Sequence, residues 1–339
     1  MDLASLNDVA NRMVAPGKGL LAADESTGTI QKRFDAIAVE NTEANRRDYR
    51  EFMFRDTEAM QNISGVILFD ETINQHAADG APLVKIIEDA GAIPGIKVDE
   101  GAKPLPAFPG ETITYGLDGL PDRLKDYRGR GARFAKWRAV IDIAEGVPTA
   151  GAVRANAQAL ARYANLCQAA DIVPIVEPEV LMDGNHDIAR CEEVTRFTLH
   201  TVFDELFQLR VALEGMILKP NMIVPGLAGA QRVSAQEVGE RTAAVLKACV
   251  PAAVPGVAFL SGGQGDEEAT ANLDAVNRVG GLPWPVTFSY GRALQHAAQK
   301  AWGGKAENVK AAQAAFTKRA KMNGLAARGE WTAELESKD

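Results

Sequence analysis

The chain has 339 residues, of which 46% are hydrophobic and 24% are charged, a balance typical of a soluble globular protein. Its 45 acidic and 37 basic residues give a net charge of −8, which argues against nucleic acid or an anionic membrane as the main partner. Three widely spaced cysteines without a CxxC motif fit a reducing compartment. The N-terminal residues lack the blocks of a signal peptide, and no uncharged apolar run approaches about 18 residues. We therefore expect a cytoplasmic protein without a membrane span.

Eight short apolar runs read as strands, and helix-prone stretches separate them. The runs cover residues 19–24, 64–70, 95–99, 134–140, 172–180, 216–218, 256–263 and 285–292. The helical stretches cover residues 3–15, 30–62, 81–90, 152–170, 187–210, 234–249 and 266–279, with one more after 121 and two more after 292. The segment 101–121, rich in proline and glycine, is expected to be a loop.

Alternating strands and helices predict parallel strands joined by crossover helices. Eight such units predict a single α/β domain, a closed (β/α)8 or TIM barrel, with residues 3–15 as an N-terminal capping helix. An open doubly wound sheet is the structural alternative. No repeat of fixed period indicates a solenoid. Within 30–62, the charges of Glu43, Arg46, Arg47 and Arg50 have the pattern of solvated helix faces.

One apolar strand, residues 216–218, runs directly into Lys219 and stops at Pro220. Burial and neighbouring cations both disfavour the charged form of an amine, so a lysine in such a place can become a nucleophile that forms a Schiff base with a carbonyl compound. The alternative is that Lys219 simply extends into solvent from the end of its strand.

Polar residues recur at or near the carboxyl ends of the predicted strands. They are Asp24, Lys97, Lys136, Glu177, Lys219, Ser261 and Arg292. Since residues i and i+2 of a strand share a face, Arg138 points the same way as Lys136, and Glu179 the same way as Glu177. The carboxyl ends of barrel strands converge on one mouth, where the active sites of barrel enzymes lie. We therefore expect these side chains to form one site.

Lysines and arginines beside carboxylates suit an anionic, phosphorylated substrate. The segments 261–263 and 290–292 end the seventh and eighth strands, where barrels commonly bind phosphate through backbone N–H groups. The chain has no Walker A motif and no dinucleotide fingerprint, and its four histidines show no metal-binding spacing. We therefore expect no metal and no organic cofactor. A protonated Schiff base on a lysine can serve as the electron sink instead.

Six longer motifs follow one another along the chain. They are GKGLLAADESTG (17–28), FAKWR (134–138), VPIVEPE (173–179), LKPNM (218–222), FLSGGQ (259–264) and FSYGRAL (288–294). Together they resemble the class I fructose-bisphosphate aldolase family, over about residues 5 to 325. The resemblance implies a TIM barrel, usually a homotetramer. The implied reaction is the reversible cleavage of fructose 1,6-bisphosphate to dihydroxyacetone phosphate and glyceraldehyde 3-phosphate, through a Schiff base and an enamine.

The resemblance also implies roles for individual catalytic residues. Lys219 would be the Schiff-base nucleophile, and Glu177 the acid and base for carbinolamine formation and dehydration. Glu179 would hold the charge network beside it. Asp24 would help to remove the proton of the C4 hydroxyl group during carbon–carbon cleavage. Lys136 would orient the substrate and, as a nearby cation, disfavour the charged form of the nucleophilic lysine.

Substrate-binding roles follow from the same resemblance. Arg138 would share the orienting role of Lys136. The pocket for the phosphate on C1 would consist of Ser261, Gly262, Gly291 and Arg292. The pocket for the far phosphate would consist of Ser26, Thr29 and Lys97, with a contribution from Arg33.

The C-terminal end departs from the family pattern. Better-known members end in a tyrosine on a mobile tail, whereas no tyrosine follows Tyr290 here, so a preference between bisphosphate and monophosphate substrates does not carry over. We expect one barrel domain over residues 1–325 and a mobile tail over 326–339. Two rival functions stay open: another Schiff-base or phosphate-binding barrel enzyme, such as a transaldolase-like transferase or a sugar-phosphate isomerase, and a binding protein without turnover.

Overall fold

Eight parallel strands close on themselves in the order β1-β10-β9-β8-β7-β6-β3-β2. They are β1 (Gly19–Ala23), β2 (Ile63–Leu68), β3 (Ile93–Lys97), β6 (Phe134–Ile141), β7 (Val173–Val180), β8 (Ile217–Leu218), β9 (Val257–Phe259) and β10 (Val286–Tyr290). The computed structural model describes residues 1–337. Each strand pairs with the preceding and following barrel strands in the sequence, and β1 pairs with β10 to complete the ring. The closed barrel is therefore confirmed, and the open sheet is excluded.

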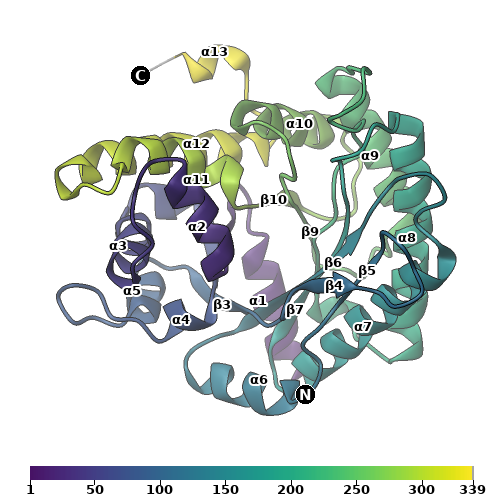
Figure 1. Cartoon of the computed structure of the whole chain (residues 1–339), viewed down its shortest axis with the longest axis horizontal. Coiled ribbons are helices and arrows are strands. Elements are labelled where there is room, and N and C mark those ends of the chain that lie inside the picture. The colour runs from purple at the N-terminus through teal and green to yellow at the C-terminus, as the bar shows by residue number, and fades with distance from the viewer. Residues whose placement is uncertain (338–339) are drawn as a thin grey trace.

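Helices surround the barrel on its outer side (Figure 1). They are α1 (Leu3–Met13), α2 (Thr27–Asp35), α3 (Glu43–Phe54), α4 (Asp70–Ile73), α5 (Leu83–Asp89), α6 (Leu120–Gly129), α7 (Ala150–Ala169), α8 (Ile188–Gln208), α9 (Ala235–Cys249), α10 (Asp266–Val279), α11 (Arg292–Trp302), α12 (Val309–Ala326) and α13 (Ala333–Glu336). Short 3-10 turns lie at η1 (Ala59–Asn62), η2 (Leu213–Gly215) and η3 (Ala306–Asn308). None of the helices within residues 1–337 is long and apolar enough to cross a membrane.

Side-chain caps fix where several of these helices begin. In each case a serine, threonine or aspartate accepts a hydrogen bond from the backbone N–H three residues later, which satisfies one of the free donors at the helix start. The capping residues are Ser26 of α2, Thr42 of α3, Thr149 of α7, Asp187 of α8 and Ser234 of α9. Because α2 begins directly after β1, its cap also fixes the path of the chain at the mouth of the barrel.

Helix α1 closes the amino-terminal end of the barrel, as its assignment as a capping helix predicts. Leu6, Ala10 and Met13 of α1 belong to one buried apolar cluster with Leu20 of β1 and Phe134 of β6. Side chains of β2, β3, β7, β8 and β9 also belong to this cluster. The amino-terminal half of the barrel interior, which we call the lower layer, is therefore a packed apolar core. A binding site inside the barrel can lie only at the opposite, carboxyl end of the strands.

Two segments differ from the sequence expectation. The helical stretch expected over 30–62 is divided into α2, α3 and η1, and Ala38 between them has a left-handed backbone with φ of 53°. The expected loop 101–121 contains a small antiparallel hairpin of β4 (Ala102–Pro104) and β5 (Thr112–Thr114). Strands of three residues are too short to give a clear alternation of polar and apolar side chains.

The C-terminal segment packs against α12 and α10 as far as residue 337. The Glu336 carboxylate accepts hydrogen bonds from Arg319 Nη1 at 2.6 Å and from Trp331 Nε1 at 2.9 Å. The side chains of Arg319 and Glu336 are 6% and 8% exposed. Helix α12 continues to Ala326, so the expected boundary after residue 325 falls in its last turn. The mobility of the tail 326–339 stays a prediction, and residues 338–339 of it lie outside the described residues.

Candidate active site

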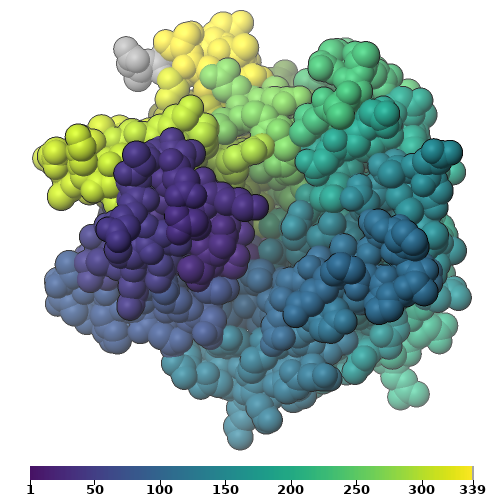
Figure 2. Space-filling model, in the orientation of Figure 1, coloured from purple at the N-terminus to yellow at the C-terminus, as the bar shows by residue number. Residues whose placement is uncertain are grey.

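A cavity of ≈ 370 Å³ opens at the carboxyl ends of the barrel strands. Figure 2 shows an opening on this face between the purple N-terminal segment and the blue-green middle of the chain. All of the site residues predicted from the sequence line it. They are Asp24, Ser26, Thr29, Arg33, Lys97, Lys136, Arg138, Glu177, Glu179, Lys219, Ser261, Gly262, Gly291 and Arg292. The structure therefore gathers into one cavity residues that are spread over more than 260 positions of the chain.

Lys219 lies at the end of β8, inside the barrel mouth rather than in solvent. Its Nζ is 3.2 Å from Oε1 of Glu177, and both side chains are only 4% exposed. The backbone N–H of Lys219 donates to the Val176 carbonyl oxygen of β7 at 2.8 Å, which fixes its position in the sheet. The extension of Lys219 into solvent is therefore excluded. A buried amine within hydrogen-bonding reach of a carboxylate can exchange a proton with it.

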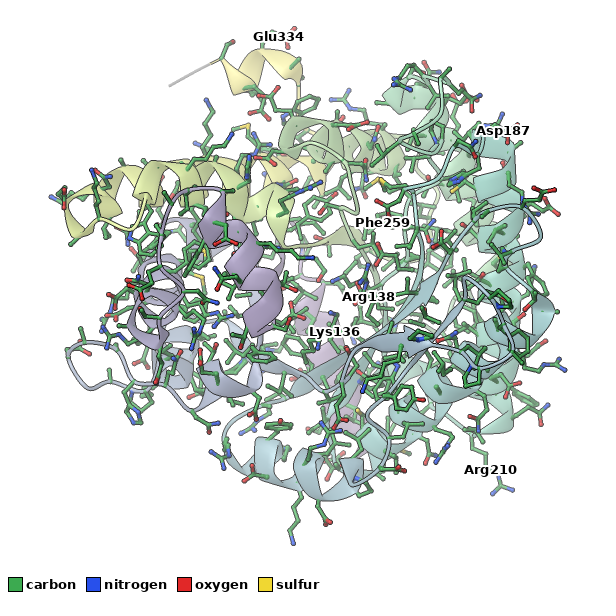
Figure 3. The ribbon with its side chains drawn as sticks, in the orientation of Figure 1. Lys136, Arg138, Asp187, Arg210, Phe259 and Glu334 are labelled. Atoms are coloured by element: carbon green, nitrogen blue, oxygen red, sulfur yellow. The ribbon has the colours of Figure 1, made fainter. Side chains whose placement is uncertain are left out.

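Lys136 connects the two carboxylates of this buried cluster. Its Nζ is 2.9 Å from Oδ2 of Asp24 and 3.4 Å from Oε2 of Glu177. Lys136 and Glu177 come from the neighbouring strands β6 and β7, which align so that Lys136 lies opposite Ile175 and Arg138 opposite Glu177, whereas Asp24 follows β1. Figure 3 places Lys136 and Arg138 close together near the middle of the barrel.

The cluster favours the charged forms of Asp24, Glu177 and Lys136. Burial opposes ionisation of Asp24, but the Lys136 and Lys219 ammonium groups outweigh it and lower the pKa of Asp24 to about 2. Burial likewise opposes a negative charge on Glu177, and the same two lysines with Arg138 lower its pKa. Burial also opposes a positive charge on Lys136, yet Asp24 and Glu177 raise the pKa of Lys136. At neutral pH Asp24 and Glu177 are therefore carboxylates, which are proton acceptors.

Arg138 and Glu179 form a further ion pair closer to the opening. Arg138 Nε donates to Oε2 of Glu179, and the side chains are 41% and 8% exposed. Burial lowers the pKa of Arg138, and the Glu179 carboxylate more than compensates, so the pKa rises overall. Arg138 therefore presents a permanent positive charge to a ligand that enters the cavity, with Glu179 holding its orientation.

The ends of β9 and β10 bring together the residues expected to bind a phosphate. Nη2 of Arg292, at the start of α11, is 3.5 Å from the carbonyl oxygens of both Gly262 and Gln264. Gly262 has φ of 56°, in the left-handed region, and a Cβ atom there would collide with Met182. The first turn of α11 adds backbone N–H groups that favour an anion. Arg33 Nη2 would be 3.5 Å from a Cβ atom placed on Gly291, so Arg33 lies on this side of the cavity.

The start of α2 forms a second polar wall of the cavity. The hydroxyl groups of Ser26 and Thr29 are hydrogen-bonded to each other at 3.1 Å. Lys97 Nζ is 3.2 Å from Oδ1 of Asp99 and 3.0 Å from the Asp99 carbonyl oxygen. A phosphate group accepts hydrogen bonds from groups of this kind: hydroxyl groups, a lysine and the N-terminus of a helix, here α2.

Three residues with polar side chains that line the cavity were missed by the sequence reasoning. Asp99 holds Lys97 and accepts a hydrogen bond from the backbone N–H of Arg138 at 3.3 Å. Lys97 and Asp99 are two residues apart at a strand end, so their spacing predicts that both side chains point into the barrel mouth, as for Glu177 and Glu179. Ser289 and Glu25 also line the cavity. Glu25 follows Asp24 directly, and strand alternation alone would place it outside the barrel.

Comparisons with known proteins agree with this geometry. The family model described as fructose-bisphosphate aldolase class-I matches residues 5–339. A protein of Xanthomonas campestris pv. campestris, named probable fructose-bisphosphate aldolase class 1, is 54% identical over 332 residues, which are 98% of this chain and 99% of that protein. Fructose-bisphosphate aldolase C of Macaca fascicularis is 52% identical over 328 residues, which are 96% of this chain and 90% of that protein.

A solved structure extends the similarity to the fold. It is the ternary co-crystal structure of fructose-bisphosphate aldolase from Plasmodium falciparum in complex with TRAP and a small-molecule inhibitor. The two chains superpose with a TM-score of 0.96 at 47% sequence identity, over 98% of this chain and 96% of that one. The chain therefore belongs to the class I fructose-bisphosphate aldolase family.

Proposed function

We propose that the buried cluster around Lys219 carries out the reaction of this family, the reversible aldol cleavage of fructose 1,6-bisphosphate to dihydroxyacetone phosphate and glyceraldehyde 3-phosphate. The observation that carries the proposal is the 3.2 Å contact between Lys219 Nζ and Glu177 Oε1 inside a cavity lined by cations. Glu177 can accept a proton from the ammonium group, which leaves a neutral amine and a protonated carboxyl group. The amine then attacks the C2 carbonyl carbon to form a carbinolamine.

The same pair completes the Schiff base. The protonated Glu177 carboxyl group returns its proton to the carbinolamine hydroxyl group, which leaves as water, and an iminium ion forms between C2 and Lys219. The positive charge of this iminium ion draws electrons from the neighbouring C3–C4 bond. Glu177 thus acts first as a base and then as an acid, and its low exposure keeps bulk water from competing for the proton.

Asp24 serves the cleavage step. Its lowered pKa keeps it ionised, and Lys136 holds its Oδ2 atom at 2.9 Å. The carboxylate accepts the proton of the C4 hydroxyl group as the C3–C4 bond breaks. The bond electrons form an enamine on the Lys219 side, and C4 becomes the aldehyde carbon of glyceraldehyde 3-phosphate. Protonation of the enamine at C3 and hydrolysis of the iminium ion release dihydroxyacetone phosphate and restore the lysine.

The cationic walls of the cavity support a substrate with two phosphate groups. The C1 phosphate is assigned to Ser261, Gly262, Gly291 and Arg292, and the far phosphate to Ser26, Thr29 and Lys97. Arg138 orients the sugar between them. Because Arg33 lies beside Gly291, we assign it to the C1 phosphate, rather than to the far phosphate as the family resemblance implied.

A cleavage assay tests the proposed function. Purified protein with fructose 1,6-bisphosphate should release both triose phosphates, and the rate should be unchanged by EDTA. A loss of activity that zinc restores would place the enzyme in a metal-dependent class. Triose formation only after addition of an aldehyde acceptor would indicate a transaldolase-like transferase instead.

We also propose a cytoplasmic homotetramer, with no membrane or nucleic acid as a partner. The Arabidopsis thaliana relative, 53% identical over 322 residues, is named as cytosolic. Light scattering after gel filtration should give four times the chain mass of 36.2 kDa, and a monomer mass would contradict the tetramer.

A further inference from the structure

Arg50 of α3 is a fully buried arginine, although the charge pattern of its helix predicts a solvated face. Its Nη2 atom donates to the backbone carbonyl oxygen of Glu25 at 2.9 Å and is 3.7 Å from Oε2 of the same residue. Its Nη1 atom is 3.8 Å from Oε1 of Glu71. Burial of a guanidinium group is costly even when it is paired, so such a group is weak evidence for stability and points to another role.

Glu25 connects Arg50 to the cavity. Its carboxylate is 3% exposed, and Oε1 accepts a hydrogen bond from Arg33 Nη1 while Oε2 faces Arg50. The Arg33 side chain is 21% exposed and lies beside Gly291 in the cavity wall. The residues Arg50, Glu25 and Arg33 therefore form a continuous row from the interior of α3 to the site assigned to the C1 phosphate.

The charges around this row do not cancel. Glu71 is held by Arg46, which donates from Nε at 2.8 Å and from Nη2 at 2.6 Å. This leaves Glu25 between two guanidinium groups, those of Arg33 and Arg50. The cluster of three arginines and two glutamates has one positive charge in excess, and of its three arginines it is Arg33 that lines the cavity, beside Glu25. A phosphate dianion near Gly291 can therefore share Arg33 with Glu25.

The position of α3 is fixed on the other side of Arg50. Tyr49 donates its hydroxyl hydrogen to Gln295 Oε1 of α11 at 2.8 Å, and Gln295 Nε2 donates to the Ala22 carbonyl oxygen of β1 at 2.6 Å. Residues 49 and 50 thus join α3 to the end of the strand that carries Asp24. The arrangement holds the carbonyl and carboxylate groups of Glu25 in one place.

We propose that Arg50 is a positioning residue for phosphate binding: by sharing the Glu25 carboxylate, it leaves the charge of Arg33 available to the substrate phosphate beside Gly291. Without Arg50, the only cation in contact with Glu25 among the described residues is Arg33, so that carboxylate competes more strongly with the phosphate. The inference rests on the proposed function for its substrate, but the binding of inorganic phosphate tests it separately.

The test compares the purified Arg50→Met variant with the purified wild-type protein, both as the full chain. We expect the KM for fructose 1,6-bisphosphate and the competitive inhibition constant of inorganic phosphate to rise about fivefold or more, with kcat within about twofold, because binding is lost equally in the ground and transition states. Arg50→Lys, which keeps the charge, should restore most of the affinity. Arg50→Gln should raise the KM and the phosphate inhibition constant in the same way as Arg50→Met. It replaces Arg50→Met if the methionine variant does not fold.

Arg47→Met is the matched control, because Arg47 lies on the same helix and pairs with Asp48 rather than with Glu25 or Glu71. Its phosphate inhibition constant should stay within about twofold of the wild-type value. Unchanged phosphate affinity in a folded Arg50→Met or Arg50→Gln variant, or an equal loss in Arg47→Met, overturns the inference. If the wild-type protein does not cleave the bisphosphate, the proposed function fails instead, and phosphate binding measured by calorimetry still decides the role of Arg50.

Discussion

The lower and upper layers of the barrel interior are built from the same strands but have opposite chemistry. Phe134 of β6, Ile175 of β7 and Ile217 of β8 belong to the apolar cluster that α1 closes. Two residues further along the same strands, on the same side, stand Lys136, Glu177 and Lys219. A step of two residues, about 6–7 Å, therefore separates a packed core from a cluster of buried charges.

The contrast between the apolar and the charged layer explains why the charged groups at the strand ends are reactive. The apolar layer excludes water from below, so the charged groups above it can be satisfied only by one another or by a ligand. Such a cluster adds little to stability compared with apolar side chains of similar size. Substitutions in the upper layer should therefore reduce activity more than stability, whereas substitutions in the lower layer should reduce stability more than activity.

The largest effect is expected at Lys219. Lys219→Met should abolish turnover, because it removes the amine proposed to form the Schiff base, while the circular dichroism spectrum and the melting temperature stay close to the wild-type values. Lys18→Ala, which changes a lysine outside the cavity, should keep full activity. Residual cleavage by Lys219→Met at a rate near that of the wild type would refute the mechanism.

A smaller loss is expected at Glu177. In Glu177→Gln the side chain keeps its size but can no longer move a proton between Lys219 and the carbinolamine, so kcat should fall by about 10²–10⁴-fold. Rapid-quench measurement of Schiff-base formation should show that this step has become slow. A normal rate of Schiff-base formation would assign the proton transfer to another group.

In the lower layer, Phe134→Ala should reduce the free energy of unfolding by about 3–5 kcal/mol, because it leaves a cavity beneath the charged cluster. Urea unfolding measures the loss. The activity per folded molecule should stay within severalfold of the wild-type value. Loss of activity without loss of stability would mean that the two layers are not separable as described.

The pH dependence of stability gives the smallest effect. The pKa of Asp24 is lowered from 3.8 to about 2, because Lys136 and Lys219 outweigh the cost of burial. The ionised Asp24 carboxylate therefore contributes to the free energy of unfolding above pH 4. This contribution, about 2 kcal/mol, is lost as the pH falls through about 2. Asp24→Asn should show a shallower loss of stability than the wild type between pH 5 and 2.5. Parallel curves would show that Asp24 is not held in its ionised form.

Most of the barrel could be predicted from the sequence, because each strand is a local apolar run and each helix has its own periodicity. The site followed from one further rule, that strand ends converge, which placed Lys136, Glu177 and Lys219 together correctly. The sequence prediction was wrong for Arg50, which is buried and not solvated. Its partners Glu25 and Glu71 belong to other segments of the chain, so no local pattern reports the contact.

The most direct test is to reduce the protein with borohydride in the presence of dihydroxyacetone phosphate and to map the adduct by mass spectrometry. One covalent modification should appear, on Lys219 in the peptide 211–232, and it should require both reagents. An unmodified lysine at that position after complete inactivation, or an adduct on another lysine, would contradict the account.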